Sequence, residues 1–299
     1  MWIVPARKKL PSTFGTVFAL VLLSIAPHGF GTSIAHADEE DPGGWHAKGR
    51  IQLVDTRGNG ESTTAGLDLA LTRTGDRAEI EVAVGGLLVE NTTLERSAVG
   101  SVDDFVIEES ENQQTPAENA YFSLEYQFAL SESVLFVSGG RWERDELAGF
   151  TDRYSAHLGL GLATKGSKGG CLETSLSASW IRQDDLVVAD DTVDEYPGLR
   201  LLTRYSRNLG ENSRFESTWQ IDGNLDDQED VRSDWSNAFR VSVNRWISFE
   251  IEARWLYDSR PALELIPLDD GSDIDPPLEV PAPLDENQTR FTIALVLLR

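Results

Sequence analysis

The sequence contains little cysteine and little basic charge, and each shortage excludes a class of protein. Its one cysteine, Cys171, cannot form an internal disulfide, so disulfide bonds do not hold the fold together. Only 26 lysines and arginines stand against 50 aspartates and glutamates, which gives a formal charge of −24. Such a chain repels the phosphates of nucleic acid and attracts metal cations or basic partners. We therefore exclude nucleic acid as a partner.

Long hydrophobic runs are also missing. No run of 18 apolar residues follows residue 37, which excludes a helical inner-membrane protein. Residues 1–37 have the form of a Sec secretion signal, with basic residues at 7–9 (RKK), an apolar core at 14–26 and a small-x-small cleavage site at 35–37 (AHA). That core is too short to span about 30 Å of hydrocarbon as a helix. No cysteine lies near the cleavage site, which excludes a lipoprotein. We expect residues 1–37 to be removed, leaving 23 basic against 50 acidic residues, or −27.

What the sequence does contain is a strict alternation of apolar and polar residues, clearest between residues 119 and 165. The apolar positions there are Phe122, Leu124, Tyr126, Phe128, Leu130, Val134, Phe136, Trp142, Tyr154, Ala156, Leu158, Leu160 and Leu162. A period of two over segments this long, joined by tight turns and polar loops, is typical of antiparallel strands. A sheet with one apolar and one charged face predicts a closed barrel with lipid outside and a polar interior.

The same pattern recurs along the rest of the chain. We count twelve segments of roughly the length that a tilted strand needs to cross a bilayer. They are centred on residues 45–55, 67–71, 78–84, 120–130, 134–145, 153–162, 172–180, 199–205, 215–221, 235–243, 249–257 and 289–299. The sequence therefore predicts an all-β, antiparallel, up-and-down transmembrane β-barrel of about twelve strands, formed as one domain by residues 38–299.

The lengths of the connections support this prediction, because they sort by parity. Counted from a periplasmic N-terminus, the even connections are all short, at 73–76, 131–133, 165–170, 208–212 and 244–247. The long connections are all odd, at 92–118, 184–195 and 260–286, and they are acidic. Short periplasmic turns and long extracellular loops are the asymmetry of outer-membrane barrels.

Aromatic residues near the strand ends agree with a membrane position. The outward face carries Trp142, Tyr154, Trp180, Trp235, Trp255 and Tyr257, as an interfacial girdle requires. A soluble β-sandwich would also alternate. It accounts poorly for the long strands and the one-sided loop lengths, so we favour the barrel.

Several short motifs resemble a known family. They are residues 121–145, residues 153–162 with their Gly-Leu-Gly, Gly58-Asn59 with residues 62–64 (STT), and residues 257–261 (YDSRP). The mature chain resembles the domain-of-unknown-function 481 family, whose members are described as salt-induced outer-membrane proteins. The resemblance implies location in the cell outer membrane, insertion by the barrel-assembly machinery and no established catalytic residue. Such barrels commonly end in an aromatic residue, whereas this chain departs from that pattern and ends Leu298-Arg299.

Alternation also places charged residues on the interior face. The residues expected to line the lumen are Arg141, Glu143, Asp145, Arg153, Glu173, Arg200, Arg204, Arg240, Glu250, Glu252 and Arg254, together with Lys48, Arg50, Glu79, Glu81, Glu125 and Glu216. One hypothesis is a channel whose arginines draw small anions, such as acidic sugars, through a charged constriction. The other is that the nearly balanced charges pair across strands and fill the barrel. Unpaired charges away from water are costly, so we favour pairing.

The acidic connections could bind divalent cations through carboxylate oxygens. The candidate ligands are Asp190, Asp191, Asp269, Asp270, Asp273 and Asp275. No spacing matches the twelve-residue calcium loop with its glycine and terminal glutamate. We therefore expect no cofactor beyond loosely bound divalent cations, which would bridge the protein to lipopolysaccharide phosphates. The expected partners are outer-membrane lipid and lipopolysaccharide.

An enzyme is disfavoured because nucleophilic catalysis needs a base beside a nucleophile. The mature chain has only His46 and His157, both on the presumed interior face and neither in a recognisable serine motif. The sequence therefore predicts a non-enzymatic outer-membrane barrel, either an anion-preferring channel for small solutes or a non-conducting surface protein acting through its acidic, cation-binding loops.

Overall fold

A computed structural model describes residues 44–57, 62–88, 93–101, 104–113, 119–166, 170–188, 194–269 and 278–298. The predicted secretion signal at residues 1–37 and the C-terminal Arg299 lie outside these ranges. The signal therefore stays a prediction.

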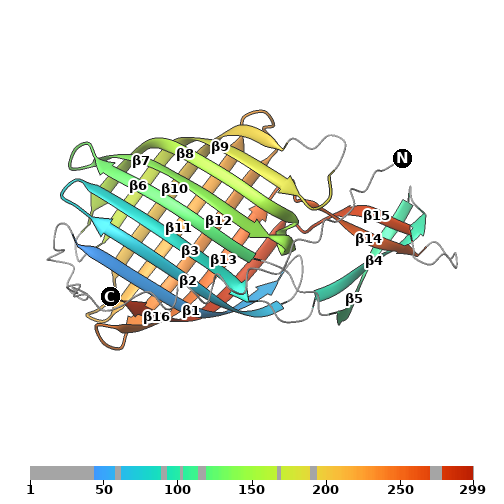
Figure 1. Cartoon of the computed structure of the whole chain (residues 1–299), viewed down its shortest axis with the longest axis horizontal. Coiled ribbons are helices and arrows are strands. Elements are labelled where there is room, and N and C mark those ends of the chain that lie inside the picture. Colours follow the sequence, from blue (N-terminus) through green and yellow to red (C-terminus); the bar gives the residue numbers. More distant parts are fainter. Residues whose placement is uncertain are drawn as a thin grey trace, which may run out of the picture. The chain divides into compact units, whose positions relative to one another are not determined.

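Twelve strands form a closed barrel, which confirms the predicted fold class (Figure 1). Each strand pairs antiparallel with both neighbours, and β1 closes the barrel by pairing with β2 and β16. The barrel strands are β1 (Trp45–Arg57), β2 (Ser62–Thr74), β3 (Ala78–Leu88), β6 (Asn119–Ala129), β7 (Val134–Asp145), β8 (Phe150–Lys165), β9 (Cys171–Asp185), β10 (Glu195–Asn208), β11 (Ser213–Asn224), β12 (Val231–Ser242), β13 (Ile247–Asp258) and β16 (Asn287–Leu298).

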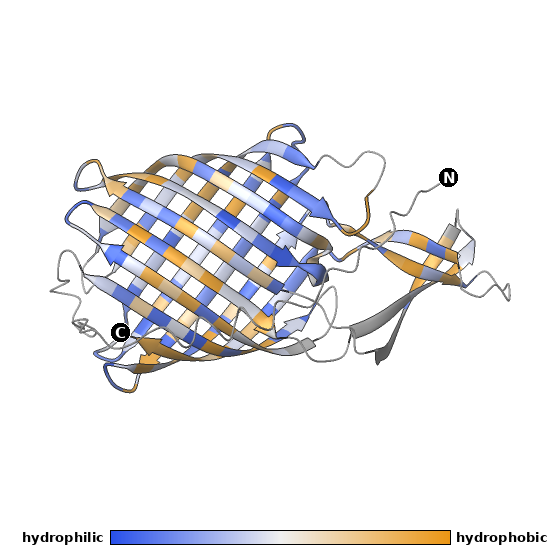
Figure 2. Ribbon diagram, in the orientation of Figure 1, coloured by the Kyte–Doolittle hydropathy of each residue, from blue (hydrophilic) through white to orange (hydrophobic). Residues whose placement is uncertain are grey.

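The predicted alternation decides which face of each strand turns inward (Figure 2). In β13, Glu250 is 3% exposed, while the next residue, Ile251, is 47% exposed. The pairing register places apolar side chains of neighbouring strands beside one another, since Ile251 lies opposite Phe239 of β12 and Ile293 of β16. A slip of one residue would turn every apolar side chain of a strand into the interior, so this pattern fixes the register.

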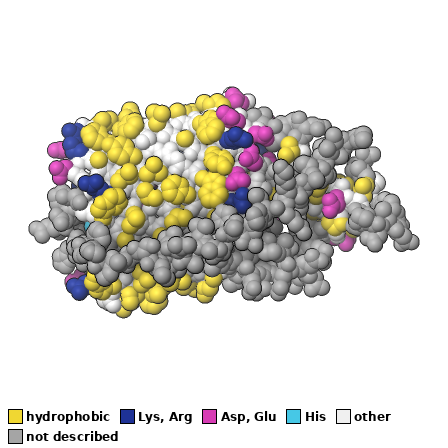
Figure 3. All heavy atoms as spheres, in the orientation of Figure 1, with side chains coloured by type: hydrophobic (Ala, Val, Ile, Leu, Met, Phe, Trp, Pro, Cys, Tyr) yellow, Lys and Arg dark blue, Asp and Glu magenta, His cyan; other side chains and the backbone are white. Residues whose placement is uncertain are grey.

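On the face shown in Figure 3, hydrophobic side chains are spread over the described middle of the barrel, and charged side chains gather toward its ends. The exposed apolar residues include Leu158, Leu160 and Leu162 of β8, each more than half exposed. An apolar belt of this kind is stable against lipid, because exposing so much apolar surface to water would cost free energy. The part of the chain that the structure describes contains no helix with the length and hydrophobicity of a membrane span.

The connections divide the barrel ends as predicted. The end with the tight turns β2–β3, β6–β7, β8–β9, β10–β11 and β12–β13 is called the short-turn end here. The opposite end, called the long-connection end, carries β1–β2, β7–β8, β9–β10 and β11–β12 together with the two longest connections, between β3 and β6 and between β13 and β16.

The two longest connections are not loops throughout, and that part of the prediction was wrong. Their described residues form β4 (Thr93–Ser101), β5 (Asp104–Gln113), β14 (Leu263–Asp269) and β15 (Leu278–Pro283). These four strands make a second sheet in the order β15-β14-β4-β5, in which β14 and β4 run parallel. Its strands are short, and its apolar positions are buried only when the two hairpins meet.

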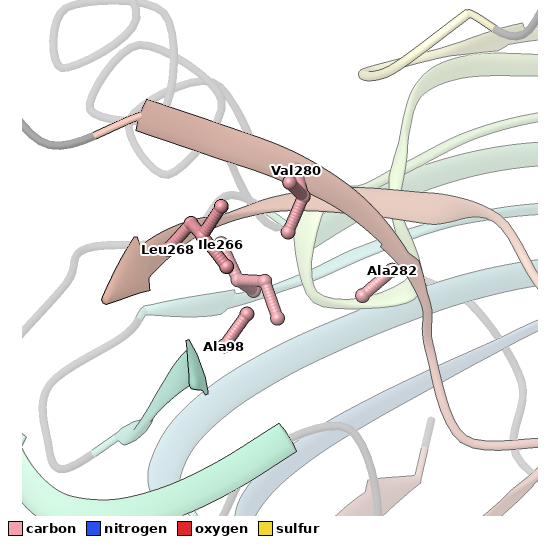
Figure 4. Close-up of a cluster of buried hydrophobic side chains, with 5 residues drawn as sticks. All are labelled: Ala98, Ile266, Leu268, Val280 and Ala282. Carbon is pink, nitrogen blue, oxygen red and sulfur yellow. The ribbon is translucent and has the colours of Figure 1, made fainter. Parts of the chain in front are cut away.

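The second sheet has a small hydrophobic core of its own (Figure 4). Ala98 of β4 is fully buried and lies directly opposite Leu268 of β14. Ile266, Val280 and Ala282 complete the cluster, each at most 2% exposed. These contacts join segments about 170 residues apart, so no local sequence pattern could predict them.

Candidate functional site: the charged barrel interior

The interior contains a cavity of about 480 Å³ lined mainly by charged and polar side chains. It extends from the long-connection end, where Asn119 and Gln288 line it, to Glu81, Glu125 and Arg204, deeper in the barrel. Eleven of the seventeen predicted lumen residues line it: Arg50, Glu81, Glu125, Arg141, Glu143, Asp145, Arg153, Arg200, Arg204, Glu252 and Arg254. The other six, Lys48, Glu79, Glu173, Glu216, Arg240 and Glu250, do not line it. Four of these six, Glu173, Glu216, Arg240 and Glu250, form ion pairs on the same inner face.

Near the long-connection end, one ion pair joins strands that are not neighbours. The Arg290 guanidinium of β16 lies 2.7 Å from the carboxylate of Asp145 in β7. No pairing connects these two strands in the barrel, so the contact reaches across the interior. Asp145 also accepts hydrogen bonds from the Asn119 amide at 2.8 Å and from the Ala148 backbone N–H at 3.2 Å. The Ala148 contact ties the short helical turn 146–148 to the wall of the cavity.

Two arginines share one glutamate in the adjoining part of the wall. Arg141 and Arg153 lie 2.8 Å and 3.3 Å from the Glu143 carboxylate. Each guanidinium also stacks on an aromatic ring, Arg141 over Tyr121 at 4.3 Å and Arg153 over Phe150 at 3.9 Å. A guanidinium is planar and weakly hydrated, so it suits both contacts at once. These residues together form one part of the cavity wall.

Arg50 is the centre of a second network. Its guanidinium lies 3.0 Å from Glu250, 3.1 Å from Glu252 and 3.6 Å from Asp68. The Arg50 Nε atom is near Glu250 without the alignment of a hydrogen bond, so that contact is mainly electrostatic. Arg240 donates a 2.9 Å hydrogen bond to Glu250 from the other side. The network fills the β1, β12 and β13 side of the barrel.

His157 is fixed between two charged groups. Its Nε2 atom lies 3.3 Å from the Glu125 carboxylate, and its Nδ1 atom lies 3.2 Å from the Arg200 guanidinium, which also pairs with Asp222 at 2.7 Å. A guanidinium can only donate, so Nδ1 accepts, and in the neutral ring the proton is on Nε2, the nitrogen that faces Glu125. The one lone pair of the neutral ring is thus directed at Arg200.

Several interior residues were not among the predicted site residues. They are Asp68, Asp222, Arg232, Asp234 and Arg290, all in ion pairs of the inner face. The signal that would have found them is the same alternation, extended to the strand ends. Asp222 lies one position past Ile221, and Arg290 one position before Phe291.

Of the six predicted cation ligands in the connections, the structure describes one. Asp269 ends β14 and is exposed, whereas Asp190, Asp191, Asp270, Asp273 and Asp275 lie outside the described residues. Within the described ranges, no group of three histidine, cysteine, aspartate or glutamate side chains is placed to hold a metal ion.

Comparison with known families decides the relationship. A family model described as "Protein of unknown function, DUF481" matches residues 51–269. The chain belongs to this family. The match runs from β1 to the end of β14, so it includes most of the barrel and most of the residues that line the cavity. It confirms the resemblance drawn from the motifs. No curated protein matches this DUF481 chain.

Solved barrels resemble the DUF481 chain only distantly. An outer-membrane channel of Pseudomonas putida F1, COG4313, is 10% identical with a TM-score of 0.47 and covers 90% of this chain and 100% of its own. The KdgM porin in complex with disordered oligogalacturonate is 7% identical with a TM-score of 0.43, and the match covers 83% of this chain and 98% of that porin. An anion-selective porin from Comamonas acidovorans is 8% identical with a TM-score of 0.40, and the match covers 85% of this chain and 98% of that porin.

Proposed function

We propose that this protein is a non-enzymatic outer-membrane barrel that passes small charged solutes through a narrow, arginine-rich interior. The observation that carries the proposal is the charged cavity of about 480 Å³ inside a closed barrel. The apolar belt supports a membrane position. The short-turn and long-connection ends support the periplasmic and extracellular orientation of outer-membrane barrels.

Anion preference is the finer part of the proposal, and unequal exposure within ion pairs supports it. The Arg204 side chain is 39% exposed, against 16% for its partner Glu173. The Arg141 side chain is 34% exposed, against 24% for Glu143. In these two pairs the guanidinium is the group more open to a solute, whereas in the Arg240–Glu216 pair the carboxylate is, at 34% against 15%. Rings of arginine favour anions in pores, so we infer a preference for small anions.

The second candidate is a non-conducting barrel that acts at the cell surface through its long, acidic connections. It is favoured by the packing of the interior beyond the cavity. Ser248 and Val296 are fully buried, and Ala294 is 2% exposed, on inward-facing positions of β13 and β16. Side chains packed this closely leave no room for water at these positions, toward the short-turn end of β13 and β16.

The experiment is single-channel recording of the refolded mature protein in a planar bilayer, with the anion-to-cation permeability ratio measured under a salt gradient. Discrete steps with a ratio above one support the channel. The Arg204→Ala variant is then expected to lower that ratio. Arg260→Ala is the matched control, because Arg260 pairs with Asp227 and Glu229 in the connections and does not line the cavity. Silence from protein with circular dichroism and heat-modifiable gel mobility typical of a folded barrel favours the non-conducting candidate.

A further inference from the structure

The outer surface of the barrel carries a second cavity, which faces the lipid. It has a volume of about 440 Å³ and crosses β12, β13, β16 and β1. Eight of its ten lining residues face outward, in two neighbouring rows of the sheet, and the other two, Arg254 and Arg290, belong to the inner face. This cavity is called the outer groove here. The first row is Trp235, Trp255, Thr289 and Arg57, and the second is Asn237, Ala253, Phe291 and Asp55.

The groove exists because small side chains lie between large ones. Ala253 lies directly between Asn237 and Phe291 in its row, and Thr289 lies between Trp255 and Arg57. The two indoles are held in place, since Trp255 donates to Asn287 at 3.0 Å and Trp235 donates to Ser217 at 3.2 Å. These hydrogen bonds orient the two indole rings at the edge of the hollow. The volume is within the range of about 300–1,000 Å³ found for ligand pockets.

The groove is apolar at one end and charged at the other. The next outward-facing row toward the short-turn end consists only of large apolar residues, each at least 40% exposed: Phe239, Ile251, Ile293 and Leu53. At the other end Arg57, the last residue of β1, has a 68% exposed side chain and lies 3.5 Å from Asp55. Asn287 and Ser233 add an amide and a hydroxyl near the same edge. The groove therefore offers an apolar channel that ends in a cation, a carboxylate and neutral polar groups.

We propose that the outer groove is a binding site for one molecule of a phosphorylated, acylated glycolipid of the outer leaflet, the lipid A part of lipopolysaccharide. One acyl chain would lie between Trp235 and Phe291 over Ala253. A phosphate would accept hydrogen bonds from Arg57, and the sugar amides and hydroxyls would meet Asp55 and Asn287. The inference goes beyond solute passage but rests on the proposed outer-membrane location, with the long-connection end facing outward.

A similar charge pair elsewhere shows why the groove is needed. Arg182 and Asp184 of β9 also lie two residues apart on the outward face, at 3.6 Å, with side chains 52% and 42% exposed. Arg182 lies opposite the Glu195 carboxylate, and Trp180 lies opposite Ala156. Carboxylates thus flank Arg182 on two sides, and this site is not part of the outer groove. A phosphate is expected to be repelled there.

The test counts bound lipid. Each protein is refolded in phosphatidylglycerol nanodiscs that contain a small fraction of lipid A, released into detergent and measured by native mass spectrometry. The expected result is one retained lipid A on the wild type. Ala253→Phe fills the hollow and is expected to lower retention about tenfold by excluding the acyl chain from it. Arg57→Gln removes the cation and is expected to lower retention about tenfold through the loss of a charge-assisted contact.

Matched controls separate the groove from general lipid contact. Ala156→Phe enlarges an outward alanine beside a tryptophan, and Arg182→Gln removes an outward arginine of an Asp–Arg pair. Both are expected to retain lipid A as the wild type does. The proposal would be overturned if the two control variants lost as much lipid A as the groove variants do. It would also be overturned if the wild type retained phosphatidylglycerol as well as it retains lipid A, or if the groove proved to be a dimer interface. Channel recordings on the same variants test the proposed function separately, since none of the four residues carries an ion pair of the inner face.

Discussion

Single residues in the barrel interior act through shared ion pairs, and Glu250 shows this most clearly. Its side chain is 3% exposed and lies between Arg50 and Arg240, whose side chains are each 15% exposed. A carboxylate between two arginines balances charges that would otherwise be stranded away from water. Removing one partner of a buried ion pair is strongly destabilising, because it leaves the other charge buried without a countercharge. Replacing the whole pair by well-packed apolar residues, in contrast, is often neutral.

Glu250→Gln is therefore expected to lower the free energy of unfolding by about 3 kcal/mol, because two buried guanidinium groups lose their shared countercharge. Urea unfolding of the refolded barrel in detergent, followed by tryptophan fluorescence, measures this. Glu229→Gln is the control, since Glu229 is 85% exposed and its pair with Arg260 is screened by water. Its expected change is below about 1 kcal/mol. Equal effects of the two substitutions would contradict the role assigned to Glu250.

At the scale of elements, close contact between β8 and β9 depends on a missing side chain. A Cβ atom at Gly159 would lie 2.2 Å from the Leu176 carbonyl oxygen and 2.4 Å from the Ser177 hydroxyl. Gly140, in contrast, has its nearest obstacle at 3.5 Å. The glycine at 159 is thus required by packing against a backbone that cannot move aside, and the inward-facing serines of β9 fill the space instead.

Gly159→Ala is expected to destabilise the barrel by about 1–3 kcal/mol through overpacking, while Gly140→Ala changes its stability by less than about 1 kcal/mol. The midpoint of thermal loss of heat-modifiable gel mobility ranks the two variants. A Gly159→Ala barrel as resistant as the wild type would show that β8 and β9 are not packed as closely as described.

The second sheet has a hydrogen-bond ladder and a hydrophobic core of its own, separate from those of the barrel. Ala98→Asp places a carboxylate among Ile266, Leu268 and Val280, where no water can solvate it. Backbone amides of β4, β5, β14 and β15 are then expected to exchange hydrogen at least tenfold faster, with no change in the barrel strands. Hydrogen-exchange mass spectrometry measures this strand by strand. Val99→Asp is the control, because the Val99 side chain is 39% exposed.

At the scale of the whole molecule, the two ends of the barrel differ in chain length and chemistry. Five tryptophans lie toward the long-connection end, at Trp142, Trp180, Trp219, Trp235 and Trp255. Four of their indole N–H groups donate to a polar residue nearer that end, at Asp152, Glu195, Ser233 and Asn287. An indole with its ring in lipid and its N–H toward water marks an interface, so this end has a defined membrane boundary.

The proposed orientation predicts which residues a reagent reaches from outside the cell. Cys171 begins β9 at the short-turn end, so a membrane-impermeant maleimide is expected to leave it unlabelled on intact cells. On a Cys171→Ser background, Asp226→Cys in the β11–β12 connection is expected to be labelled, and Glu211→Cys in the β10–β11 turn is not. Permeabilised cells should label both. Labelling of Glu211→Cys on intact cells would invert the orientation.

The sequence by itself determined the barrel: the number of its strands, the face that each turns inward and the sorting of long and short connections follow from a period of two and from turn residues, which are local. It also placed Arg141, Arg200 and Glu250 on the inner face. Only the tertiary structure decided which charges meet, because Arg290 reaches Asp145 from a strand that is not its neighbour. The second sheet and the outer groove belong to the same class. Each depends on segments far apart in the chain coming together, and period-two alternation carries no information about which distant segments will do so.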